Sequence, residues 1–140
     1  MKVRLVETPY FIAVLNKKLC IVEIYWKEET KGFTDEVYKE SFFQLAELIT
    51  QHEVGAIYVL ATFFEFIIGV DLQEWHDQVI FPMLVKGGVK KIAIVNCSEF
   101  VTKLSIEQIF ETSDSQQSFS TNFFNNEIQA RIWLIDKQWV

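Results

Sequence analysis

The chain has 140 residues, of which 50% are hydrophobic and 15% are aromatic. This is enough apolar material for a domain with its own core, so we expect a single domain over residues 1–140 rather than a disordered chain. The 13 basic and 19 acidic side chains give a net charge of −6, and there is no basic run. Because such a surface repels phosphate backbones, nucleic acid is not an expected partner.

Two strand-like runs come first, over residues 10–16 and 19–26. Both are rich in Ile, Val, Tyr and Phe, and a short turn containing Asn16 separates them, so they indicate an antiparallel hairpin. A polar link then leads to an amphipathic helix over residues 35–52, which Thr34 can cap and whose first turn is acidic. We expect this helix to cover one face of a sheet.

The next segment, VGAIYVLATFFEFIIGV over residues 54–70, raises the question of a membrane span. A spanning helix needs about 20 apolar residues, and this run has Glu65 near its middle, where a carboxylate is costly. Gly55, which we expect to end the preceding helix, is followed by β-branched and aromatic residues. The pattern therefore predicts a buried strand over residues 56–61 and an apolar loop at its carboxyl end, with no membrane span.

A second helix is expected to start at Asp71, whose side chain can cap it, and to be kinked or split at Pro82. Gly87 and Gly88 are expected to end it. The continuous apolar run over residues 90–96 then predicts another buried strand.

The last third is predicted to hold a helix over residues 97–111, a polar loop over 112–118, a short strand over 119–124 and a final helix capped by Asn125. Strands that alternate with helices predict an α/β fold with right-handed crossovers. We expect a mostly parallel sheet of four to five strands, with an antiparallel edge hairpin and about four helices.

Three segments of this pattern resemble a known family. They are LQEW at residues 72–75, KKIAIV at 90–95 and FFNNEIQARIWL at 123–134. Together with the order of elements, they resemble the STAS-like fold of sulphate-transporter and anti-sigma-factor antagonist domains, and more closely a group of small stand-alone bacterial proteins of that fold. The resemblance implies one STAS-like domain over residues 1–140 with a regulatory, non-enzymatic role.

In the anti-sigma-factor antagonists, a Ser or Thr beside the loop after the central strand is phosphorylated by a partner kinase. The corresponding loop here has no Ser and offers only Thr62. The resemblance therefore implies a phosphorylation site at Thr62. The residues alone favour a different role, because a hydroxyl directly after a strand is more often buried and bonded to the backbone.

Histidine and cysteine, which act as metal ligands and nucleophiles, are few in this sequence, with two of each. His52 and His76 are not spaced as metal ligands, so we expect both to be solvated on helix surfaces, with no metal or cofactor. Cys20 and Cys97 lie in apolar runs, as reduced, buried thiols of a cytoplasmic protein do, and the first residues do not resemble a secretory signal. Cys97 could instead be activated at a helix start, but the pattern places no histidine near it. We expect no enzyme.

The apolar loop is the candidate functional site, because open α/β sheets bind ligands at the carboxyl ends of their strands. Its side chains could fold back as core, but alternating directions in an extended segment make it hard to bury them all. We therefore expect at least one of Phe64 and Phe66 at the surface. The candidate partner- or ligand-binding residues are Thr62, Phe63, Phe64, Phe66, Ile67, Ile68 and Trp75.

These residues favour a regulatory or protein-interaction module, in which the loop binds a protein partner or a second copy of the chain. The alternative is a carrier or sensor of a small, lipid-like apolar ligand bound near residues 62–70. Neither function needs a nucleophile–base pair or a carboxylate dyad. The sequence pattern does not bring together residues for such a pair or dyad.

Overall fold

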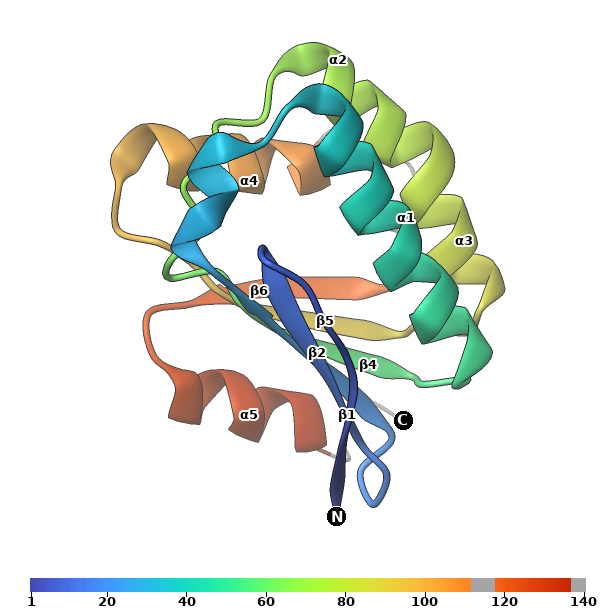
Figure 1. The fold of residues 1–140 in the computed structure, drawn as a ribbon. Coiled ribbons are helices and arrows are strands. Elements are labelled where there is room, and N and C mark those ends of the chain that lie inside the picture. Colours follow the sequence, from blue (N-terminus) through green and yellow to red (C-terminus); the bar gives the residue numbers. More distant parts are fainter. Residues whose placement is uncertain (112–117, 137–140) are drawn as a thin grey trace.

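The computed structural model describes residues 1–111 and 118–136. Its strands form one mixed sheet, in which each strand lies beside its neighbours in sequence (Figure 1). The strands are β1 (Lys2–Glu7), β2 (Phe11–Asn16), β3 (Ile21–Trp26), β4 (Ala56–Leu60), β5 (Lys91–Val95) and β6 (Ser120–Phe124). β1 to β3 pair antiparallel, and β3 to β6 pair parallel. The predicted α/β class, with a parallel sheet extended by an antiparallel edge, is confirmed.

The sheet has six strands rather than the four to five expected, and the additional one is β1 at the edge. Its first residues alternate between polar and apolar side chains, but its register with β2 shifts between Arg4 and Val6. Such a bulge places an extra residue in the strand and breaks the period of two. Sequence periodicity misses the strand for this reason.

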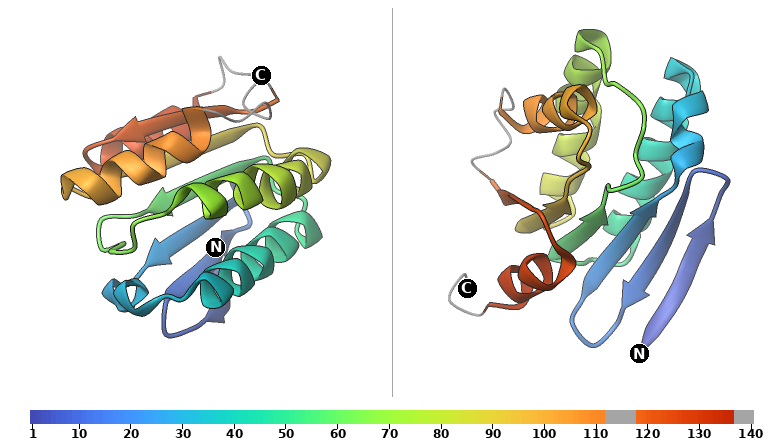
Figure 2. Two further views of the ribbon diagram at one scale, coloured as in Figure 1. Left: turned by 90° about the horizontal axis from the view of Figure 1, so that it is seen from above. Right: turned by 90° about the vertical axis from the view of Figure 1, so that its left-hand side faces the viewer.

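The helical segments are η1 (Glu28–Gly32), α1 (Asp35–Gln51), α2 (Val70–Trp75), the π-helical turn η2 (His76–Ile80), α3 (Phe81–Lys86), α4 (Phe100–Glu111) and α5 (Glu127–Ile135). α2, η2 and α3 follow one another without a break, so the described residues hold four main helices. Because the strand order is sequential and parallel crossovers share one hand, α1 to α4 lie on one face of the sheet (Figure 2). α5 lies on the opposite face, against β4, β5 and β6.

The start of α1 agrees with the prediction, and its end differs slightly. The Thr34 side chain accepts a hydrogen bond from the Val37 amide, as the predicted cap requires. The chain leaves the helix through Glu53, which has a φ of 51°, rather than through Gly55. The left-handed conformation that favours glycine is thus taken by the residue two positions earlier.

Two other predicted caps are displaced. α2 begins after Gly69 without a side-chain cap, so Asp71 lies in the first turn, where its carboxylate still suits the helix dipole. α5 is capped by Asn126, which accepts from the Gln129 amide, and not by Asn125. Two adjacent asparagines cannot be told apart by composition, and only the backbone decides which one caps.

The helical stretch after the apolar loop is interrupted, as Pro82 predicts. In η2 the Phe81 amide donates to the His76 carbonyl, five residues back. Pro82 has no amide hydrogen to continue the α-helical ladder, which accounts for the change of pitch beside it. Gly88, with a φ of 93°, ends the stretch as expected.

The segment over residues 54–70 contains two residues that lead into a strand, the strand itself, a loop and the first residue of a helix. β4 supplies the strand, residues 61–69 form the loop, and α2 begins at Val70. Among the described residues, no helix is long and apolar enough to cross a membrane. Apart from its last residue, the polar loop expected over 112–118 lies outside the described residues.

The core has two parts, one on each side of the sheet. The larger part lies between the sheet and helices α1 to α4 and contains Trp26, whose ring packs 5.3 Å from that of Phe11 and 6.2 Å from that of Phe33. The smaller part lies beneath α5, around Ala130 and Leu134. The candidate functional residues belong to the larger part and to the edge above it.

Candidate functional site

The apolar loop, residues 61–69, crosses the carboxyl edge of the parallel strands between β4 and α2 (Figure 1). Two buried hydroxyl groups hold it in place. Thr30 Oγ1 accepts a hydrogen bond from the Glu65 amide at 2.9 Å, and Ser105 Oγ accepts one from the Ile68 amide at 3.1 Å. Each hydroxyl donates in turn to a backbone carbonyl of its own segment. The loop is therefore fixed by η1 on one side and by α4 on the other.

Neighbouring side chains of this loop point in opposite directions. Phe63 and Ile67 are 56% and 54% exposed, whereas Phe64 and Ile68 are each 3% exposed. Phe66 is partly buried against the larger core. Of the pair expected to reach the surface, only Phe66 keeps part of its ring exposed. Phe64 and Ile68 belong to the core, because the extended loop turns alternate side chains towards the sheet.

Thr62 and Trp75 complete the predicted set, and the structure separates them from the buried loop residues. Thr62 is exposed, so its hydroxyl is not the buried group that its place after a strand favours. Trp75 lies on α2 and is partly buried, with its ring 6.1 Å from that of Tyr38 and the Lys39 ammonium 5.8 Å above it. Trp75 packs α2 against α1 rather than contributing to the exposed part of the loop.

α4 adds exposed apolar side chains that the sequence pattern did not single out. The Ile68–Ser105 hydrogen bond and the one from Gln73 Nε2 to Gln108 Oε1 place α4 beside the loop and α2 (Figure 2). The exposed apolar side chains of these three segments, here named the edge surface, are Phe63, Ile67, Val70, Phe100, Val101 and Leu104. They are 38% to 72% exposed.

The segments that carry the edge surface, together with η1 beside them, are acidic. Their exposed carboxylates are Glu28, Glu29, Glu65, Asp71, Glu74 and Glu111, and Glu99 lies directly before α4. The cations in the same segments are Lys31 and Lys103. Glu99 also caps α4 by accepting from the Thr102 amide at 2.9 Å. The edge surface is thus apolar with an acidic border.

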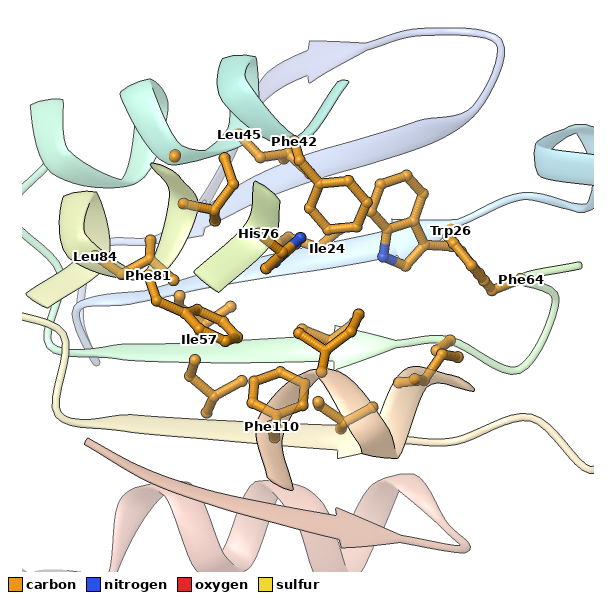
Figure 3. A pocket seen from close by; sticks show the side chains of 18 of the residues that line it. Ile24, Trp26, Phe42, Leu45, Ile57, Phe64, His76, Phe81, Leu84 and Phe110 are labelled. Atoms are coloured by element: carbon orange, nitrogen blue, oxygen red, sulfur yellow. The ribbon is translucent and has the colours of Figure 1, made fainter. Parts of the chain in front are cut away.

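A cavity of about 90 Å³ lies in the larger core, between the sheet and helices α1, α3 and α4 (Figure 3). Twenty residues line it, and His76 is the titratable one among them. Phe64 and Ile68 are part of the lining. The inward side chains of the loop therefore border this cavity, while its outward side chains form the edge surface.

His76 is buried, with 4% of its surface exposed, which corrects the expectation of a solvated histidine. η2 turns this residue towards α1, where Tyr38 Oη lies 3.1 Å from His76 Nδ1. Burial lowers the pKa of His76 to about 3, so the ring is neutral at physiological pH. His52 is exposed at the end of α1, as predicted.

A second polar cluster lies on the α5 face of the sheet. The Glu23 side chain is 1% exposed and accepts from Lys2 Nζ at 3.1 Å, Tyr25 Oη at 2.6 Å and Arg131 Nη1 at 3.0 Å. Burial alone would raise the pKa of Glu23, but these three hydrogen bonds outweigh it and lower that pKa. Arg131 also lies 4.1 Å above the Tyr58 ring. Through these contacts Glu23 of β3 binds side chains from both β1 and α5.

The cysteines differ from one another. Cys97 is buried, as expected, and its thiol donates to the Glu99 carbonyl at 3.8 Å. Burial raises the pKa of Cys97, which disfavours the thiolate. Cys20 is exposed, contrary to expectation, because it ends the hairpin turn with a φ of 56° rather than entering β3. Within the described residues, no group of three or more His, Cys, Asp and Glu side chains could hold a metal ion.

The three segments that carry the STAS-like resemblance lie in α2, at β5, and from β6 through α5. No family model, curated protein or solved structure matches the chain.

Proposed function

We propose that the protein is a non-enzymatic regulatory module of STAS-like type that binds a protein partner through the edge surface. The observation that carries the proposal is the exposure of Phe63 and Ile67 on a loop that hydrogen bonds hold from both sides. Large apolar side chains that gather at an exposed edge are characteristic of interaction sites.

The fixed conformation of the loop favours binding. Association is weakened when a loop must be ordered as it binds, and a segment that is already ordered avoids that cost. Thr30 is fully buried and Ser105 is 4% exposed, so water does not compete readily for the hydrogen bonds that position the loop. Phe63 and Ile67 are thus presented in a defined geometry.

The acidic border favours one kind of partner. A protein surface with apolar side chains flanked by lysines and arginines would complement both the edge surface and Glu28, Glu65 and Glu99 around it. A second copy of the chain would instead bring two acidic borders together, each on a protein with a net charge of −6. We therefore favour a basic partner over self-association.

Two further features support a non-enzymatic, cytoplasmic role. Among the residues that the structure describes, the thiol of Cys97 hydrogen-bonds to a backbone carbonyl and to no base, and the neutral His76 ring contacts a tyrosine hydroxyl. Neither arrangement forms the nucleophile–base pair that covalent catalysis needs. The cytoplasmic setting follows from the free thiols and stays a prediction, as does phosphorylation of Thr62, which is exposed beside Phe63.

The proposal is tested with two matched double variants. Phe63→Ser/Ile67→Ser removes the centre of the edge surface, and Ile128→Ser/Ile132→Ser removes side chains of α5 that are 72% and 60% exposed on the opposite face of the sheet. Proteins captured from a lysate of the source organism are compared by quantitative mass spectrometry, and the partner so identified is purified for titration calorimetry.

We expect the loop variant to lose about thirtyfold or more in affinity, from burial of two half-exposed apolar side chains. The α5 variant should bind as the wild type does, and added salt should weaken binding because the border is charged. Thermal melts of both variants should match the wild type. An affinity that the loop variant retains, or that the α5 variant loses equally, would refute the proposal.

A further inference from the structure

The cavity in the larger core is unusual for its size and its lining. Packed interiors contain few voids larger than a water molecule, and a single water needs only about 10–15 Å³, whereas this cavity measures about 90 Å³. All lining residues except His76 are hydrophobic, so clustered water would find few partners there. The cavity is better suited to an apolar molecule than to water.

His76 presents a hydrogen-bond donor to this space. Within the described residues, the Tyr38 hydroxyl and the His76 ring have each other as their hydrogen-bond partner and no other. We place the shared proton on the hydroxyl, so that Tyr38 Oη donates to His76 Nδ1 and the ring proton lies on Nε2. His76 is part of the lining and Tyr38 is not, so we infer that the ring turns its Nε2 side, away from the Tyr38 hydroxyl, towards the cavity.

Trp26 supplies a second donor. It is 4% exposed and lines the same cavity, and its indole nitrogen is turned towards the space between the labelled side chains in Figure 3. This N–H has no hydrogen-bond partner among the described residues. Among the described residues, Thr121 Oγ1 is the completely buried side-chain atom without a partner, and neither of these two nitrogens is. A small molecule in the cavity can therefore reach both N–H groups and accept from them.

We propose that the cavity binds a small, neutral, mostly apolar molecule that carries one hydrogen-bond acceptor, such as a ketone. The donors of His76 and Trp26 select the acceptor, and the lack of a charged group in the lining excludes an ion. The volume limits the ligand, since an engineered cavity of about 150 Å³ holds benzene. In proportion, a molecule of about three to four non-hydrogen atoms fits the cavity of about 90 Å³. The π-helical turn η2, which carries His76, is consistent with such a site, because π-helical turns are frequent at functional sites.

The test uses two probes of the same shape, acetone and isobutene, of which only the ketone can accept a hydrogen bond. Affinities are measured by NMR titration of the amide resonances in the wild type and in three variants. His76→Phe and Trp26→Phe each remove one donor and keep most of the volume. Ala46→Leu fills the cavity from α1, where Ala46 is part of the lining.

We expect saturable binding of both probes to the wild type and loss of both in Ala46→Leu. In His76→Phe the ratio of ketone to hydrocarbon affinity should fall about tenfold, the effect of one hydrogen bond, while hydrocarbon binding stays similar. If His76→Phe does not fold, the same fall in the affinity ratio is expected in Trp26→Phe. No saturable binding to the wild type, binding that persists in Ala46→Leu, or an unchanged ratio in the donor variants would overturn the proposal. None of these outcomes depends on whether the edge surface binds a partner.

Discussion

Phe63 and Phe64 are adjacent in sequence, and the structure predicts opposite consequences when each is replaced by serine. Phe64 is 3% exposed, with its ring 5.2 Å from that of Trp26 and 6.1 Å from that of Phe33. Truncating a buried phenylalanine costs about 3–5 kcal/mol, and a buried serine hydroxyl adds to that cost. Because Phe64 already borders the cavity, its removal would enlarge a void that the core has not closed.

We therefore expect Phe64→Ser to lower the free energy of unfolding by about 4 kcal/mol, and Phe63→Ser to change it by less than about 0.5 kcal/mol. Urea denaturation followed by tryptophan fluorescence measures both, and an unchanged m-value would show that the denatured state is comparable. In a thermal melt, the loss in Phe64→Ser should correspond to about 15 °C. Equal losses in the two variants, or a larger one in Phe63→Ser, would show that the loop does not alternate as described.

Three other predictions concern titratable groups. Between pH 7 and pH 5 the free energy of unfolding should fall by about 2 kcal/mol more in the wild type than in His76→Phe. The reason is that His76 takes up a proton in the unfolded chain but not in the folded one, where its pKa is lowered to about 3. Parallel pH profiles of the two proteins would contradict this. Glu23→Gln should cost about 2 kcal/mol at pH 7. This penalty should shrink as pH falls through the lowered folded pKa of Glu23, since the wild type then loses the same charge; urea titrations at pH 7 and pH 3 measure it. With a thiol reagent under native conditions, Cys20 should react quickly and Cys97 only after unfolding, and fast labelling of Cys97 would show an accessible thiolate.

The main elements could be predicted because their signals are local. The continuous apolar runs at β4 and β5 and the Thr34 cap of α1 depend only on neighbouring residues. β1 escaped prediction because its bulge breaks the alternation on which strand recognition depends. The exposure of Cys20 escaped it because a turn and a strand start one residue apart look alike in composition.

The sequence singled out the apolar loop, but the division of its side chains into inner and outer residues required the structure. Alternation in the loop predicts that some side chains stay exposed, yet it does not say which, because a shift of one residue exchanges Phe63 with Phe64. The burial of His76 depends on packing against Tyr38, 38 residues away in sequence, and nothing near His76 signals it. Phe100, Val101 and Leu104 could have been noticed as apolar residues in the first turns of a helix.

The most direct test of the proposed function is a photocrosslink placed on the edge surface in living cells. p-Benzoylphenylalanine is incorporated at position 63 in one variant and at position 128 in another, where Ile128 of α5 is more exposed than Phe63. We predict that irradiation gives a discrete adduct with a protein for position 63 and none for position 128. A discrete adduct at position 128 alone, or no adduct at either position, would contradict binding of a protein partner through the edge surface.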